Sequence, residues 1–286
     1  MYKCIKIGGF DMDKIIVGID FSKGSDCAID LAIDLANKWD NQIKLVYVLS
    51  TKYNSALMSD QEINDKINEV ITQHKGKLHN GKLDCIIRHG RVYRELNAVA
   101  EEEKAWLIVV GSHGTSGYER NWIGKNAYRT ITEAKLPVLT IRENFNFNKK
   151  LEKIVLPLDS SMETRQKVTQ AIKFARAFES QVFVIGLYSS GVADVRKIID
   201  SYVEQTEKVL TNANIKCSVA KMETENVTQT TLEFAEKINA DLIMIMAEQE
   251  KTMSNLLLGS YAQQMIHHSQ TPVLTIHSTE LHDSAR

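Results

Sequence analysis

The stretch GSHGTSGYERNWIGKN, residues 111–126, has the composition of a loop that holds phosphate groups. Gly111, Gly114 and Gly124 follow the spacing G-x2-G-x9-G, and the apolar run AWLIVV comes directly before them. Glycine lets the backbone turn sharply and approach a ligand closely. A helix that starts after Gly124 would also offer unpaired N–H groups and a positive dipole end to an anion. The spacing alone is equally compatible with a glycine-rich connection that binds nothing.

Lys125 stands where a loop of this kind usually carries a serine or threonine. The sequence GKN is not part of a P-loop, because GxxxxGK[ST] would need a glycine at Glu119 and a hydroxyl residue at Asn126. A lysine ammonium beside a polyphosphate could replace the missing hydroxyl, because charge-assisted hydrogen bonds are about twice as strong as neutral ones. We therefore interpret the loop as an altered phosphate site.

Asp20 and Asp159 each follow an apolar, strand-like run. A carboxylate at the end of a first strand can accept hydrogen bonds from a ribose, or it can cap the next helix. The glycine loop favours the ribose interpretation for Asp20. The sequence has no metal-ligand spacing and no GxSxG elbow, so we predict neither a metal site nor a protein nucleophile. His113 lies inside the loop, and its side chain could either be solvated or contact a ligand.

The elements that must position these residues occur twice. KIIVGIDFS at 14–22 returns as KIVLPLDSS at 153–161, and LPVLTIRE at 136–143 returns as TPVLTIHS at 271–278. Self-similarity of this kind indicates a repeated structural unit. We predict two domains, 13–142 and 152–277, joined by the polar stretch ENFNFNKK.

In each copy, short apolar runs alternate with stretches of helical periodicity, which predicts an α/β fold with a parallel sheet. The first copy should place helices near 28–39, 59–78, 92–104 and 124–135 between strands such as KIIVGI and AWLIVV. In such sheets, ligands bind beyond the carboxyl ends of the strands, where the strand order reverses. Three candidate residues fall at such ends: Asp20, Val48 and Gly111.

The composition is that of an ordinary globular protein of 286 residues, with 43% apolar and 25% charged residues. The formal net charge of −1 gives no broad attraction to nucleic acid or to an anionic membrane. The four scattered cysteines suggest reduced thiols. We expect residues 1–11 to pack little against the rest, with Met12 as an alternative start.

Taken together, KIIVGID, GSHGTSG, WIGKNAYRTITEAKLPVLTIR and LLLGSYAQQMIHHSQTPVLTI resemble the universal stress protein family in its tandem form. The resemblance implies two Rossmann-like units, each a five-stranded parallel sheet with helices on both faces, related by a pseudo-twofold axis. It also implies a cytoplasmic stress-response protein and, in one subgroup, binding of ATP or AMP, with or without Mg2+. The site residues implied for nucleotide binding in the first copy are Ile19, Asp20, Val48, Gly111, Gly114, Gly124, Lys125 and Asn126.

The two copies depart from the family pattern in different ways. The second copy keeps Asp159, Gly259 and Ser260, but Met246 and Gln249 replace the first two glycines. Side chains at these two places should block close approach of a phosphate to the backbone. We therefore expect a degenerate second site and one nucleotide per chain, held by the first copy.

Three functions stay open at this point. The first is a regulator or sensor that binds adenine nucleotide and acts on an unknown protein partner. The others are a scaffold without nucleotide and an α/β enzyme with slow ATP hydrolysis or phosphoryl transfer.

Residues 137–141 and 272–276 are expected to form apolar edge strands, and such edges invite pairing. We expect them to pair antiparallel, so that one chain mimics a dimer, and a further homodimer is compatible with this arrangement.

Overall fold

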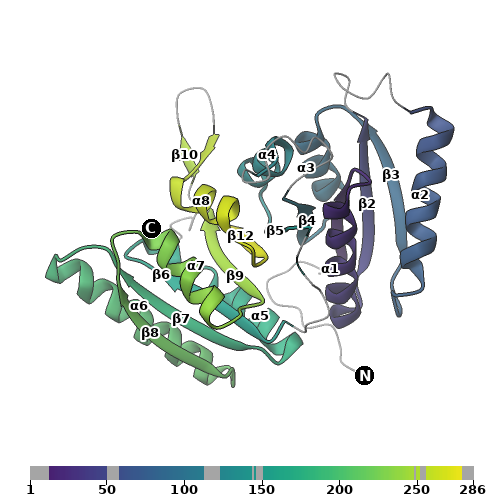
Figure 1. The fold of residues 1–286 in the computed structure, drawn as a ribbon. Helices are drawn as coiled ribbons and strands as arrows, with labels where there is room; N and C mark the ends of the chain where they lie inside the picture. Colours follow the sequence, from purple (N-terminus) through teal and green to yellow (C-terminus); the bar gives the residue numbers. More distant parts are fainter. Residues whose placement is uncertain are drawn as a thin grey trace, which may run out of the picture. The chain divides into compact units, whose positions relative to one another are not determined.

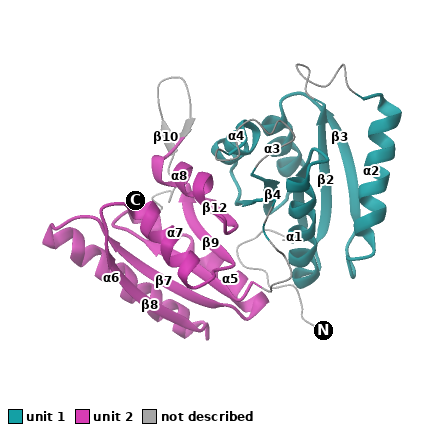
Figure 2. Ribbon diagram, in the orientation of Figure 1, with its two compact units in different colours: residues 1–148 teal, residues 149–286 magenta. Residues whose placement is uncertain are grey.

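The chain folds as two compact α/β units, whose boundary falls between residues 148 and 149 (Figure 2). This confirms the fold class expected from the repeated sequence. The proposed alternative start and the segment before it lie outside the described residues. The computed structural model describes residues 13–49, 58–112, 123–143, 145, 151–247, 249–251 and 256–278.

The first unit alternates strands and helices along its whole length (Figure 1). Its strands are β1 (Lys14–Ile19), β2 (Gln42–Leu49), β3 (Leu83–His89), β4 (Leu107–Gly111) and β5 (Val138–Ile141). Its helices are α1 (Lys23–Trp39), α2 (Asp60–Lys75), α3 (Val92–Glu102) and α4 (Lys125–Glu133). The strand order is β3-β2-β1-β4-β5, and all neighbours are parallel.

The order of strands reverses between β1 and β4, which makes their carboxyl ends the switch point of the sheet. β1 is followed by β2 on one side, whereas the chain later returns to β4 on the other side. Right-handed crossovers then place α1 and α2 on one face and α3 and α4 on the opposite face. Helices α3 and α4 pack against each other. Both begin at the carboxyl edge of the sheet, because each helix runs back against the strand before it.

The second unit repeats this plan. Its strand order β8-β7-β6-β9-β12 corresponds position by position to that of the first unit. Its sheet strands are β6 (Lys153–Leu158), β7 (Gln181–Tyr188), β8 (Cys217–Glu223), β9 (Leu242–Ala247) and β12 (Val273–His277). Its helices are α5 (Val168–Phe178), α6 (Ala193–Asn212), α7 (Val227–Lys237) and α8 (Ser260–His268). Two short elements are additions to the plan: the 3-10 turn η1 (Met162–Arg165) and the antiparallel pair β10 (Gln249–Lys251) and β11 (Leu256–Leu258).

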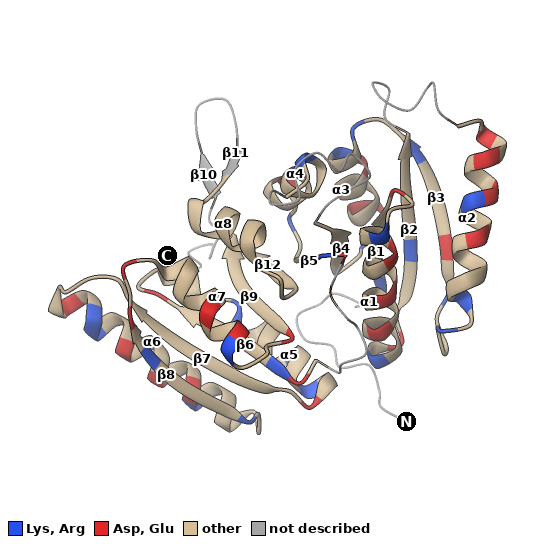
Figure 3. Cartoon of the chain, in the orientation of Figure 1, with Lys and Arg blue, Asp and Glu red and all other residues tan. Residues whose placement is uncertain are grey.

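Local sequence explains why the first helices form where they do. The Ser22 side chain accepts a hydrogen bond from the Ser25 N–H and so caps α1. The apolar positions of α1 that follow helical spacing are buried. Ser59 and Glu62 form a capping box at the start of α2. Helix α2 buries only a narrow stripe, and its other faces carry charges of both signs (Figure 3), as expected for a solvated outer helix.

The central strands are the most completely buried parts of the cores. Every residue from Leu107 to Val110 of β4 is buried, as is all of β9. Strands buried on both faces read as continuous apolar runs, which is why AWLIVV lacks an alternating pattern. Among the described residues, no helix combines the length and the apolar character needed to cross a membrane. The described cysteines Cys27, Cys85 and Cys217 are free thiols.

Candidate functional site

Asp20 shapes the turn between β1 and α1. Its Oδ1 accepts hydrogen bonds from the Ser22 N–H at 3.1 Å and from the Ser22 hydroxyl at 2.5 Å. Phe21, between them, has a left-handed backbone with φ of 61°. An aspartate that bonds to the backbone two residues ahead is typical of such a turn. Because Ser22 is the cap of α1, helix capping by Asp20 itself is not what the structure shows.

Ile19 and Val48 end neighbouring strands at the carboxyl edge. Ile19 lies opposite Tyr47 in the parallel register, and Val48 follows Tyr47 directly. Both side chains are buried, each with 6% of its surface exposed. Ile19 and Val48 can therefore contact a ligand at this edge through their backbone groups, which is the role the family resemblance implies for them.

An aromatic pair that the sequence did not single out lies beside Asp20. The rings of Phe21 and Tyr47 stack with centroids 4.7 Å apart, and the Lys66 ammonium lies 5.5 Å from the Phe21 ring centroid. Burial and the nearby Asp20 charge both raise the pKa of Tyr47. Stacked rings offer a flat apolar surface of the kind that a nucleobase prefers. Phe21 could have been found from its place directly after Asp20.

Gly111 and Gly124 are brought together across the glycine loop. The Ser112 carbonyl accepts a hydrogen bond from the Gly124 N–H at 2.7 Å, and the Ser112 N–H donates to the Ile141 carbonyl at 2.8 Å. These two bonds fix the start of α4 beside the end of β4. Gly114 and His113, between them in sequence, lie outside the described residues. The ends of the loop are thus placed, and the role of Gly114 stays a prediction.

Gly111 has a packing role that the sequence did not reveal. A Cβ atom at this position would lie 2.9 Å from the carbonyl carbon of Gly24 and 3.0 Å from its oxygen. Gly111 therefore lets the first turn of α1 come against the end of β4. The helix contact by itself calls for a glycine here, and the expectation that Gly111 also serves ligand approach stays a prediction.

Among the described residues, no side chain caps the N-terminus of α4 and no acidic residue offsets its positive end. Gly124 is the cap residue and supplies no side-chain bond, and the first turn contains no acidic residue. Lys125 and Asn126 are the first two helical residues, and both are exposed. Four N–H groups at a helix start normally need an acceptor. With the Lys125 ammonium beside them, they form a site suited to a phosphate or another anion.

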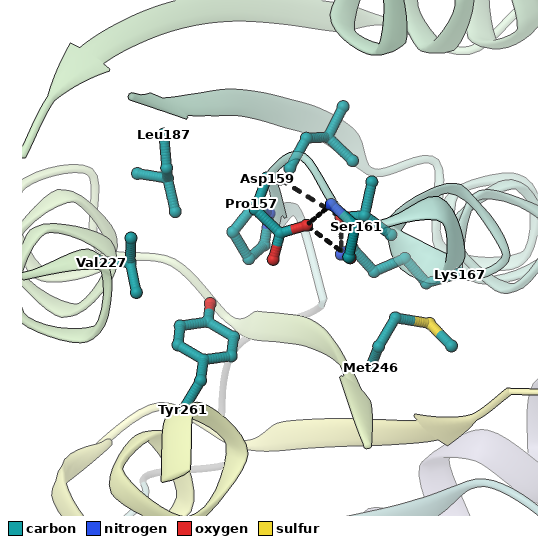
Figure 4. A pocket seen from close by; sticks show the side chains of 10 residues that line it. Pro157, Asp159, Ser161, Lys167, Leu187, Val227, Met246 and Tyr261 are labelled. Atoms are coloured by element: carbon teal, nitrogen blue, oxygen red, sulfur yellow. Dashed lines mark hydrogen bonds between the residues drawn. The ribbon is translucent and has the colours of Figure 1, made fainter. Parts of the chain in front are cut away.

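The second unit keeps the turn but fills the space above it. Asp159 Oδ1 accepts from the Ser161 N–H at 2.9 Å and from the Ser161 hydroxyl at 2.6 Å, as Asp20 does with Ser22 (Figure 4). Met246 and Tyr261 line the cavity beside Asp159, and Met246 is 5% exposed. The free volume of this cavity is about 10 Å³. That is room for about one water molecule. The degenerate second site stays a prediction.

The remaining second-copy residues lie at the edge of this filled space. Gly259 caps α8 and Ser260 is its first residue, so the helix start is retained. Gln249, the counterpart of Gly114, begins β10 and pairs with Leu258. A short hairpin thus occupies part of the stretch that corresponds to the glycine loop. Among the described residues, no group of three or more His, Cys, Asp or Glu side chains could hold a metal ion.

The fold and these sites define a tandem, doubly wound α/β protein whose two strand-end sites differ. The family model of the universal stress protein family matches residues 12–142 and again 150–277. The chain therefore belongs to the universal stress protein family and contains two of its domains.

Individual relatives agree with this assignment. A universal stress protein of Methanocaldococcus jannaschii is 30% identical over 144 residues, covering 46% of this chain and 82% of the relative. Universal stress protein YxiE of Bacillus subtilis is 27% identical over 146 residues, covering 46% of this chain and 99% of the relative. The crystal structure of a universal stress protein from Archaeoglobus fulgidus matches 94% of this chain and 99% of its own, with a TM-score of 0.75 and 18% identity.

Proposed function

We propose that this protein binds an adenine nucleotide, ATP or AMP, in its first unit and acts as a regulator or sensor in the stress response. The observation that carries the proposal is the start of α4, which no side chain of the described residues caps and which the bond between Gly124 and Ser112 holds beside the end of β4. The Asp20 turn lies at the end of the adjacent strand β1. The cytoplasmic location is part of the proposal and rests on the family.

The residues at the carboxyl edge fit the parts of such a ligand in order. Backbone groups at Ile19, Asp20 and Val48 suit the adenine, with the Phe21 ring beside them. The turn at Asp20 and the backbone at Gly111 suit the ribose. The phosphates would lie at Gly114, at Gly124 and on the first helical residues Lys125 and Asn126.

The proposal contains no catalytic step. The proposal includes no general base among the described residues near the start of α4. We therefore expect hydrolysis of bound ATP to be slow. Any Mg2+ would arrive with the phosphates, because the described residues offer no ready-made cation site. A nucleotide-dependent change at this edge would then be read by a protein partner. Pairing of residues 137–141 with 272–276, and a further homodimer, are separate proposals.

Native mass spectrometry of the full chain, purified without added nucleotide, tests the proposal. We expect a mass increase that corresponds to one adenine nucleotide and disappears on denaturation. A chain that carries no nucleotide, and whose melting temperature does not change when ATP is added, would indicate a scaffold instead. Rapid turnover of added ATP that Asp20→Ala abolishes would indicate an enzyme.

Lys125 should tune the affinity rather than decide it. In Lys125→Ser, a charged donor is replaced by a neutral hydroxyl, which keeps a hydrogen bond but removes a point charge. We expect ATP binding to persist, with a smaller preference for ATP over AMP and a weaker dependence on salt. Calorimetric titration at two ionic strengths measures both quantities. Unchanged salt dependence would show that Lys125 does not face the phosphates.

A further inference from the structure

Two arginines converge on one tyrosine, one from the start of α3 and the other from the middle of α4. The Tyr93 hydroxyl oxygen accepts a hydrogen bond from Arg91 Nη1 at 3.3 Å and from Arg129 Nη1 at 3.0 Å. Arg91 is the cap residue of α3, and Arg129 lies on α4. The Arg129 and Arg94 guanidinium groups also lie 5.1 and 5.9 Å from the Tyr93 ring centroid.

This cluster lacks the negative charge that would normally accompany it. Within the described part of the chain, Arg91, Arg94 and Arg129 form no ion pair with a carboxylate. Glu133 acts on Arg91 only through space. Like charges held this close repel one another. The hydrogen bond from Arg91, followed by that from Arg129, lowers the pKa of Tyr93. The site therefore favours an anion.

Tyr93 has an unused donor in the same place. Its side chain is almost fully buried, with 4% of the residue exposed. The oxygen accepts two bonds, and the hydroxyl hydrogen has no acceptor among the described residues. A phenolic hydroxyl can donate as well as accept. A phosphate oxygen would supply both the missing acceptor and the missing negative charge.

The second unit shows that the fold does not need this cluster. Helices α7 and α8 match α3 and α4 with a constant shift of 135 residues, and they also pack together. At the corresponding positions they carry Asn226, Thr228 and Gln264, which have no charge. The two arginines and the tyrosine of this cluster are thus specific to the first unit, as are the first two glycines of its loop.

Helix geometry connects the cluster to Lys125. Residues four apart on a helix lie on the same face, with Cβ atoms about 6 Å apart. Arg129 is four residues after Lys125, and helical side chains lean back toward the N-terminus. Arg129 therefore lies on the same face of α4 as Lys125, one helical turn from the proposed phosphate position.

We propose that Arg91, Tyr93 and Arg129 form a clamp for the distal phosphates of the bound nucleotide. This inference rests on the proposed nucleotide site in the first unit. Two guanidinium groups that bond to one oxygen are close enough for a single phosphate group to contact both, and Arg forks match phosphate oxygens well. The clamp gives the chain a preference for a nucleoside triphosphate over the monophosphate.

The test compares ATP and AMP on full-length protein by calorimetric titration. The variant combines Arg91→Asn with Arg129→Gln and so imports residues that the second unit accommodates. We expect the Kd for ATP to rise about 10- to 100-fold, and the Kd for AMP to change less than about twofold. Lys135→Gln is the matched control, because it removes a cation at the opposite ends of α3 and α4, where Lys135 pairs with Glu101.

Each outcome separates the clamp from the nucleotide site. Equal Kd values for ATP in the wild type and the double variant would overturn the clamp and leave the nucleotide site intact. An equal loss for ATP and AMP would also overturn it, because the cluster would then support the site as a whole. If the wild type binds neither ligand, the proposed function itself fails. Should the double variant melt early, Arg129→Gln alone gives the same comparison.

Discussion

Gly111→Ala is expected to lower the free energy of unfolding of the first unit by about 1–3 kcal/mol, the usual cost of forcing extra volume into a packed site. The added Cβ would lie 2.9 Å from the carbonyl carbon of Gly24, which is backbone and cannot rotate away. Either β4 or the first turn of α1 must then shift. Because that turn also contains Ser22, the partner of Asp20, nucleotide affinity should fall with stability. Denaturant unfolding measures the loss of stability, and calorimetric titration measures the loss of nucleotide affinity.

Gly76→Ala is the matched control for this substitution. Nothing lies within 4 Å of a Cβ added at Gly76, and its φ of −69° is open to any residue. Alanine there should leave stability unchanged or raise it slightly, by about 0.4–1 kcal/mol. An equal response to the two substitutions would contradict the packing role of Gly111.

The second unit shows what accompanies a larger residue at this place. Met246 is the counterpart of Gly111, and the segment that follows Asp159 is a separate 3-10 turn, Met162–Arg165, before α5 begins. In the first unit, α1 starts at once with Lys23. In the second unit, a methionine in place of Gly111 therefore occurs together with a different turn between β6 and α5.

Gly114→Gln should reduce ATP binding by the first unit at least about 100-fold, because a long side chain would occupy the path of the phosphates to the backbone. The substitution imports the residue that the second copy carries as Gln249. The melting temperature should change little, since a loop position tolerates polar residues. Gln249→Gly is the control and should leave ATP binding as it is. Undiminished binding in Gly114→Gln would show that the glycine loop is not the phosphate cradle.

Much of the fold could be predicted from the sequence, because its signals are local and occur twice. The apolar runs that form β1 and β4 are continuous, as buried parallel strands require, and the helices between them follow regular spacing. The predicted helix at 59–78 was placed correctly but is shorter, Asp60–Lys75. The sequence repeat by itself indicates which segments of the two units correspond.

The candidate site was less predictable, because its contacts join residues that are far apart in sequence. Sequence patterns show that Asp20 ends a strand, but not that Ser22 caps the helix in its place. They do not show that Gly111 faces Gly24. The cluster at Tyr93 joins residues from α3 and α4, and no local motif marks it. A comparison of charge between the two copies could have found it, since Arg129 corresponds to Gln264.

The number of ATP molecules bound per chain tests the central claim most directly. Calorimetric titration of the full chain, with protein concentration determined independently, gives this number. We predict one site per chain, lost in Gly114→Gln and retained in Gln249→Gly, because only the first unit keeps the loop glycines, whereas both units keep a helix start after a glycine. Two equivalent sites per chain, or no binding at all, would contradict the account.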